Sequence, residues 1–183
     1  MINSRAIAME TLLAWEKSQA PLDQVLEGML SEAAMDDPRD RQLVMALVYG
    51  VVRWQGYLDA IIQKFSRHPL RTMKPLTIAA LRVGLYQLVF LDRIPESAAI
   101  NETVQALKSA RQPKWLTGFV NGVLRAMVRQ RAVLPAPDEA AAVLSLVVPV
   151  ALVAMVVADK AAEAREGPEE MAQLIQEVVA EVK

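Results

Sequence analysis

Two segments of this chain concentrate basic side chains and contain no acidic residue. Residues 64–82 hold one group, and residues 103–131 hold the other. Lysine and arginine neutralise phosphates and release counterions, which gives salt-sensitive and sequence-tolerant binding to nucleic acid. We therefore expect phosphate contacts from Lys64, Arg67, Arg71, Lys74, Lys108, Arg111, Lys114 and Arg125.

Two aromatic residues, Trp115 and Phe119, interrupt the second basic group. They are four residues apart, so on a helix they share one face. Exposed aromatic rings can stack on unpaired bases, whereas buried rings fill a core. We expect Phe119 to be a core residue, and both interpretations stay open for Trp115.

Residue types that catalyse reactions or hold metals are scarce in this chain. It has no cysteine and a single histidine, His68, which precedes Pro69 in an expected loop. Without cysteine there can be no disulfide and no cysteine-ligated zinc, which fits the cytoplasm. No glycine-rich loop follows a strand to hold a nucleotide. We expect no catalytic residue, no metal and no cofactor here.

Composition and charge predict a basic helical domain followed by an acidic tail. Apolar residues make up 54% of the 183 residues but aromatic residues only 5%, which favours helices. Residues 1–131 carry 17 basic and 12 acidic side chains, and residues 132–183 carry 3 and 9. The alternative is an ordinary solvated surface whose charges are unevenly distributed.

Apolar spacing of three, four and seven residues predicts an all-α bundle of six to seven helices in residues 1–133. Ser4 is the expected cap of the first helix, and Asp37 caps a long helix over 39–65. Within that helix, Gly50 indicates close packing or a bend. Further helices are expected at 76–91, 97–110 and 114–131, and the almost uncharged segment 76–91 is expected to be central.

The remainder of the chain is expected to form a linker at 134–139 and an apolar, acidic helical tail at 140–183. Residues 140–158 contain no charge, which approaches the length that spans a bilayer. The central Pro149 and the absence of a flanking basic cluster argue against a membrane span. The apolar faces of the tail favour docking on the helical domain or on a second copy.

Several motifs occur in order along residues 5–131. Residues 47–54 read Leu-Val-Tyr-Gly-Val-Val-Arg-Trp, and residues 80–88 read Ala-Leu-Arg-Val-Gly-Leu-Tyr-Gln-Leu. Pro95, Ala98, Ile100, Asn101 and Glu102 follow, and residues 119–124 read Phe-Val-Asn-Gly-Val-Leu. Together they resemble the NusB family of RNA-binding domains, and most of all the NusB-like amino-terminal domains of bacterial 16S rRNA cytosine-5 methyltransferases.

The resemblance implies a NusB-like fold and binding to 16S rRNA. Arg5 lies in the region where NusB proteins carry an arginine-rich RNA-binding segment, so it joins the candidate RNA-binding residues. The methyltransferases use a cysteine thiolate and S-adenosylmethionine in a catalytic domain, so a non-catalytic accessory domain is implied here. The alternatives are a NusB-type antitermination factor, which binds RNA with a ribosomal protein, and a protein-interaction module.

The motif residues are expected to support the fold before they contact RNA. Asn101 and Asn121 can bond backbone groups at helix ends, and Gly84 and Gly122 allow helices to approach closely. The expected structural group consists of Asn101, Glu102, Phe119, Asn121 and Gly122.

Overall fold

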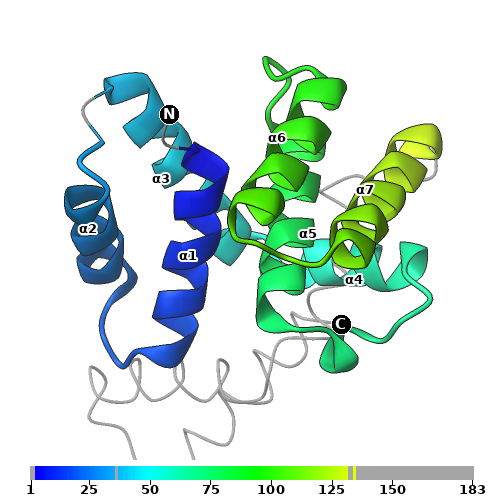
Figure 1. Ribbon diagram of the computed structural model, residues 1–183, viewed down its shortest axis with the longest axis horizontal. Helices are drawn as coiled ribbons and strands as arrows, with labels where there is room; N and C mark the ends of the chain where they lie inside the picture. The colour runs from blue at the N-terminus through cyan, green and yellow to red at the C-terminus, as the bar shows by residue number, and fades with distance from the viewer. Residues whose placement is uncertain (1–2, 36, 132–133, 135–183) are drawn as a thin grey trace, which may run out of the picture. The chain divides into compact units, whose positions relative to one another are not determined.

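The computed structural model describes residues 3–35, 37–131 and 134, and every regular element within them is helical (Figure 1). The predicted all-α bundle is confirmed. The helices are α1 (Ser4–Lys17), α2 (Leu22–Glu32), α3 (Pro38–Arg53), α4 (Gln55–Phe65), α5 (Pro75–Phe90), α6 (Glu96–Ser109) and α7 (Lys114–Arg129), with a 3₁₀ turn, η1 (Leu70–Thr72), before α5.

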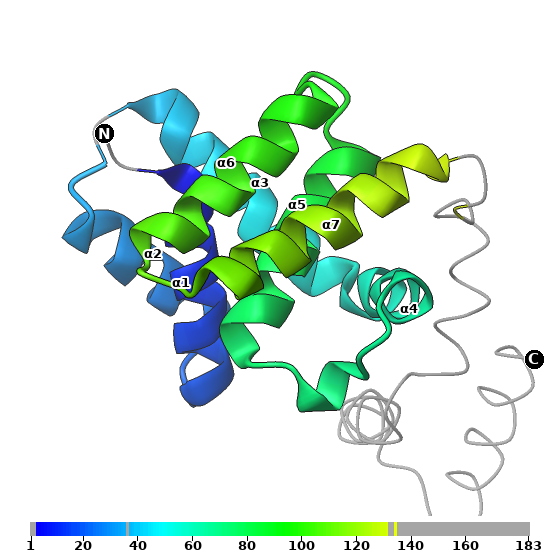
Figure 2. The same ribbon diagram turned by 45° about the vertical axis from the view of Figure 1, so that its right-hand side comes forward.

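Helix α5 is the centre of the bundle. It packs against α1, α3, α4, α6 and α7, and in Figure 2 the antiparallel pair α6 and α7 lies in front of it. Several of its side chains have no solvent exposure, among them Leu81, Val83 and Leu85. Charged side chains are costly to bury, so the nearly uncharged sequence suits this position. The prediction that this segment is central is confirmed.

Two glycines allow the closest contacts of α5 with its neighbours. Gly50 of α3 faces the Tyr86 ring of α5, and a Cβ at Gly50 would overlap that ring. Gly84 of α5 faces α7, and a Cβ there would lie 2.6 Å from Cδ1 of Leu124. The close packing expected at Gly50 and Gly84 is confirmed.

The predicted long helix over 39–65 is wrong, because the chain breaks at Trp54. This residue leaves helical geometry at φ −105° and ψ 17°, so α3 ends before it and α4 begins after it. Its ring stacks on Phe90 with centroids 5.0 Å apart, and Phe90 stacks on Tyr86 at the same separation. This aromatic contact with α5 is a tertiary interaction, which apolar spacing along one helix does not reveal.

Helix caps were predicted correctly at α3 and misplaced by one residue at α1. The Asp37 carboxylate accepts a backbone N–H of α3 at 2.8 Å, as expected. At α1 the cap is Asn3, whose Oδ1 accepts two first-turn N–H groups at 2.9 and 3.2 Å. Ser4 is instead a buried helical residue, and its hydroxyl donates to Asp40 of α3 at 2.7 Å.

The predictions of a linker at 134–139 and a helical tail at 140–183 fall, apart from Leu134, outside the described residues. So does the prediction of self-association through the tail. Within the described ranges, no helix combines the length and apolar character needed to cross a bilayer.

Replacing Gly50 with alanine tests the contact between α3 and α5. The added methyl displaces the Tyr86 ring, so we expect the free energy of unfolding to fall by about 1–3 kcal/mol. Gly28→Ala is the matched control, because Gly28 is exposed on α2 and a Cβ there meets nothing within 4 Å. The control should raise stability by about 0.5–1 kcal/mol. Urea unfolding of the full chain measures both, and similar effects of the two changes would contradict the packing.

Candidate nucleic-acid interface

The first basic group lies at the end of α4 and in its connection to α5. Its exposed cations are Lys64, Arg67, Arg71 and Lys74. None of the four forms an ion pair with a described carboxylate. Local bonds shape the connection, because the Ser66 hydroxyl donates to the His68 carbonyl at 2.9 Å and accepts its N–H at 3.0 Å. The cations are therefore presented on a defined turn.

The His68 ring joins this connection to α7. It meets the Phe119 ring edge to face, with centroids 5.7 Å apart and an angle of 67° between planes. Phe119 is half-buried at the edge of the bundle. The expectation that it lies in the core is therefore wrong. The contact places the first basic group beside the amino-terminal half of α7, which carries Lys114 and Trp115.

Trp115 is the most exposed large apolar side chain described, at 67%. The sequence left open whether Trp115 is exposed or packs in the core, and the structure shows that it is exposed. Its ring stands one helical turn from Phe119, so the two aromatic residues follow the same side of α7. An exposed indole among lysines and arginines has the chemistry to stack on a base.

Helices α5 and α7 both begin with uncapped first turns. The residue before each helix, Lys74 and Pro113 respectively, makes no capping side-chain bond, and neither first turn contains an acid. Unbonded N–H groups and the helix dipole make such ends electropositive, which favours anions nearby. This effect adds to the charges of Lys74 and Lys114.

Lys108 lies in the last turn of α6, and Arg111 lies on the turn between α6 and α7. The Arg111 N–H bonds the Lys108 carbonyl at 2.9 Å, and the Gln112 N–H bonds the Leu107 carbonyl at 3.1 Å. These are the two bonds of a Schellman motif, in which glycine is usual at the left-handed position. Arg111 occupies that position with φ 52°, so this exposed cation is held with backbone strain.

Arg5 lies in the first turn of α1, against α5. It is half-buried, and its Nε donates to Oε1 of Gln87 in α5 at 2.9 Å. Burial lowers its pKa, and the charges of Glu102 and Asp40 oppose that shift. Next to it, the Asn3 amide donates to Glu102 at 3.3 Å. Arg5 and Glu102 therefore tie the start of α1 to its neighbours, and a contact of Arg5 with RNA stays a prediction.

Arg82, which belongs to the basic segment 64–82, is neutralised inside the fold. Its Nε and Nη2 bind the Asp59 carboxylate at 2.8 and 2.9 Å, and Nη1 binds Glu16 at 3.0 Å. Burial disfavours the charged guanidinium, but the two acids outweigh this effect and raise the pKa of Arg82. Arg82 cross-links α5 to α4 and α1, so its charge is not available to phosphate.

The two asparagines and the glycine of the motif on α6 and α7 are not buried. Asn101 and Asn121 stand inside helices, so the predicted bonds to helix-end backbone groups are wrong. Asn101 is exposed, while Oδ1 of Asn121 accepts a hydrogen bond from Nε of Arg125 at 3.0 Å. A Cβ at Gly122 would meet nothing within 4 Å, so its predicted close packing is wrong as well.

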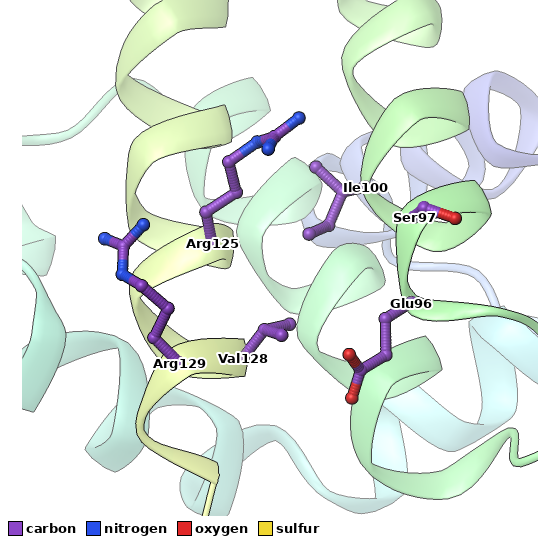
Figure 3. Close-up of a pocket in the computed structure, with 6 residues that line it drawn as sticks. All are labelled: Glu96, Ser97, Ile100, Arg125, Val128 and Arg129. Atoms are coloured by element: carbon purple, nitrogen blue, oxygen red, sulfur yellow. The ribbon is translucent and has the colours of Figure 1, made fainter.

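Arg125 lies toward the far end of α7 from Trp115. Together with Arg129 it lines a groove of about 370 Å³ between α6 and α7 (Figure 3). The other lining residues are Glu96, Ser97, Ile100 and Val128. The sequence places Arg129 on the same face as Arg125, four residues away, where it either binds phosphate or is solvated; it is not among the residues for which we expected phosphate contacts.

We call the cations Lys64, Arg67, Arg71, Lys74, Lys108, Arg111 and Lys114, with Trp115, the basic face. The bundle and this face define an all-α domain. Positive charge and an exposed aromatic ring are presented by the α4–α5 connection, the end of α6, the α6–α7 turn and the start of α7. Residues 2–129 match the NusB family. The chain belongs to that family.

Among similar proteins are methyltransferases of ribosomal RNA. The chain is 37% identical over 126 residues to the probable ribosomal RNA small subunit methyltransferase B of Bacillus subtilis, covering 69% of this chain and 28% of that protein. It is 37% identical over 129 residues to ribosomal RNA small subunit methyltransferase B of Pseudomonas putida, covering 70% of this chain and 28% of that protein. The chain therefore spans about 28% of the length of these relatives.

Solved NusB structures share the fold. The crystal structure of antitermination factors NusB and NusE in complex with dsRNA matches with a TM-score of 0.63 and 23% identity, covering 69% of this chain and 94% of that chain. NusB of T. maritima matches with a TM-score of 0.62 and 23% identity, covering 74% of this chain and 92% of that chain. At these identities the likeness establishes the fold alone.

Replacing Arg111 with glycine tests the strained turn. Glycine adopts the left-handed conformation freely, so we expect a gain in unfolding free energy of up to about 1 kcal/mol. Lys108→Gly removes the same charge from inside α6 and should instead cost about 1 kcal/mol. Thermal unfolding of both variants is the measurement, and a loss of stability in the Arg111 variant would contradict the strain.

Proposed function

We propose that this chain is an RNA-binding accessory domain of a 16S rRNA cytosine-5 methyltransferase, and that it is not itself catalytic. Family membership and the 37% identity to two small-subunit rRNA methyltransferases support the proposal. So does the share of about 28% of those proteins that it matches. We assign methyl transfer, with its cysteine thiolate and S-adenosylmethionine, to a separate catalytic domain.

The observation that carries the proposal is the contact between His68 and Phe119. It brings the cations of the α4–α5 connection beside α7, although the two segments lie far apart in sequence. Such a surface binds phosphates by releasing counterions, so affinity falls steeply with salt. Trp115 adds a stacking surface for a base. The domain thus holds rRNA while the catalytic domain acts on it.

A second candidate is a NusB-type antitermination factor. It is favoured by the likeness in fold to NusB in the structure with NusE and dsRNA. In that role the chain binds RNA together with a ribosomal protein. Adding NusE to an RNA titration separates the candidates, because an accessory domain of a methyltransferase should show no gain in affinity.

The double variant Arg67→Gln, Arg71→Gln tests the basic face. Each lost phosphate contact lowers the slope of log affinity against log salt by about 0.7–0.9, so the pair should lower it by about 1.5 and weaken binding roughly tenfold. A 16S rRNA fragment titrated with the full chain at two or more salt concentrations measures this.

The matched control is Lys17→Gln, Arg39→Gln, which removes the same charge from exposed positions on α1 and α3. It should leave the slope nearly unchanged. Binding that ignores salt, or equal losses in both double variants, would contradict a specific role of the basic face.

A further inference from the structure

The exposed side of α7 is continuous from Trp115 to Arg129. Positions 115, 118, 122, 125 and 129 are separated by three or four residues, so they follow one face of the helix, and all five are exposed. The two in the middle are Gly118 and Gly122, where an added Cβ would meet nothing within 4 Å. The face therefore has an aromatic ring near one end, an open strip in the middle and two arginines toward the other end.

The arginine end of this face borders the groove between α6 and α7. Its apolar floor comes from Ile100 and Val128. Figure 3 shows Arg125 reaching from α7 toward α6 above Ile100, while Arg129 extends on the other side of α7. The groove thus combines an apolar surface suited to a ribose or base edge with the guanidinium of Arg125 at its margin.

The charge at this end is positive and uncompensated. Glu96 is the one carboxylate that lines the groove, and it is already paired with Arg131 at 2.9 Å. Asn121 holds Nε of Arg125 at 3.0 Å, which leaves both terminal nitrogens of Arg125 without a bond to a described residue. Arg129 has no described carboxylate partner. Guanidinium forks of this kind match phosphate oxygens.

We infer that an unpaired RNA strand lies lengthwise along α7, with one base stacked on Trp115 and phosphates bound by Arg125 and Arg129. The inference rests on the proposed RNA-binding function and extends its site beyond the basic face. Arg129 follows Trp115 by fourteen residues, which is about 21 Å along the helix. This length matches about six stacked nucleotides at roughly 3.4 Å each.

A single strand fits this face better than a duplex does. Bases within a duplex are stacked on one another and offer no free face to Trp115, whereas unpaired bases do. The glycine strip lets a backbone approach α7 without meeting side chains. Asn121 is a positioning residue in this arrangement, because its bond to Nε points the other nitrogens of Arg125 outward.

Oligouridylate RNA of about twelve nucleotides and an RNA hairpin of equal length, titrated with the full chain, test the inference. Arg125→Gln, Arg129→Gln should weaken oligouridylate binding roughly tenfold and lower the salt slope by about 1.4. Trp115→Ala should weaken it roughly fivefold to a hundredfold with little change of slope. Gly118→Leu, Gly122→Leu should obstruct the strip and weaken binding while thermal stability is retained.

The outcomes separate this inference from the proposed function. If Arg67→Gln, Arg71→Gln weakens rRNA binding while the α7 variants do not, the path along α7 is wrong and the basic face remains. If neither RNA binds in a salt-dependent way, the proposed function itself fails. Tighter binding of the hairpin than of oligouridylate, with Trp115→Ala neutral, also overturns the unpaired strand. The control Lys17→Gln, Arg39→Gln should match the unmodified chain.

Discussion

The enclosure of α5 by five other helices is the constraint on which the described structure depends. A helix buried on most sides needs neighbours that approach closely, and Gly50 and Gly84 supply that approach. Its polar groups must also be satisfied internally. Gln87 meets this need by accepting from Arg5 and donating to the Val83 carbonyl and the Thr103 hydroxyl, at 3.0 and 3.2 Å.

The same constraint distinguishes two arginines at α5 from the cations on the connections around it. Arg5 and Arg82 lie against α5 or on it, where an uncompensated charge would be costly, so they bond Gln87, Asp59 and Glu16. Cations on the connections around α5 remain in water and have no described carboxylate partner. Free positive charge therefore collects at the α4–α5 connection, the α6–α7 turn and α7, although the whole chain has a net charge of −1.

Packing of α7 against α5 explains how one helix can serve both fold and surface. Leu116, Val120, Leu124 and Met127 are buried on its inner side, and Trp115, Arg125 and Arg129 lie on its outer side. Phe119 sits at the boundary, where the His68 ring covers it. The family motif at 119–124 crosses both sides, so its residues have different physical roles despite being adjacent in sequence.

Local sequence patterns predicted the all-α class, most helix boundaries, the central position of α5 and the two basic groups, because periodicity, caps and charge are local properties. The break at Trp54 could not be predicted in this way, because it depends on the stacking of the Trp54 ring on α5. Contacts between helices also settle which arginines are neutralised and leave Asn101, Asn121 and Gly122 outside the buried core. These outcomes depend on which residues meet across helices, and spacing along one helix carries no information about its partners.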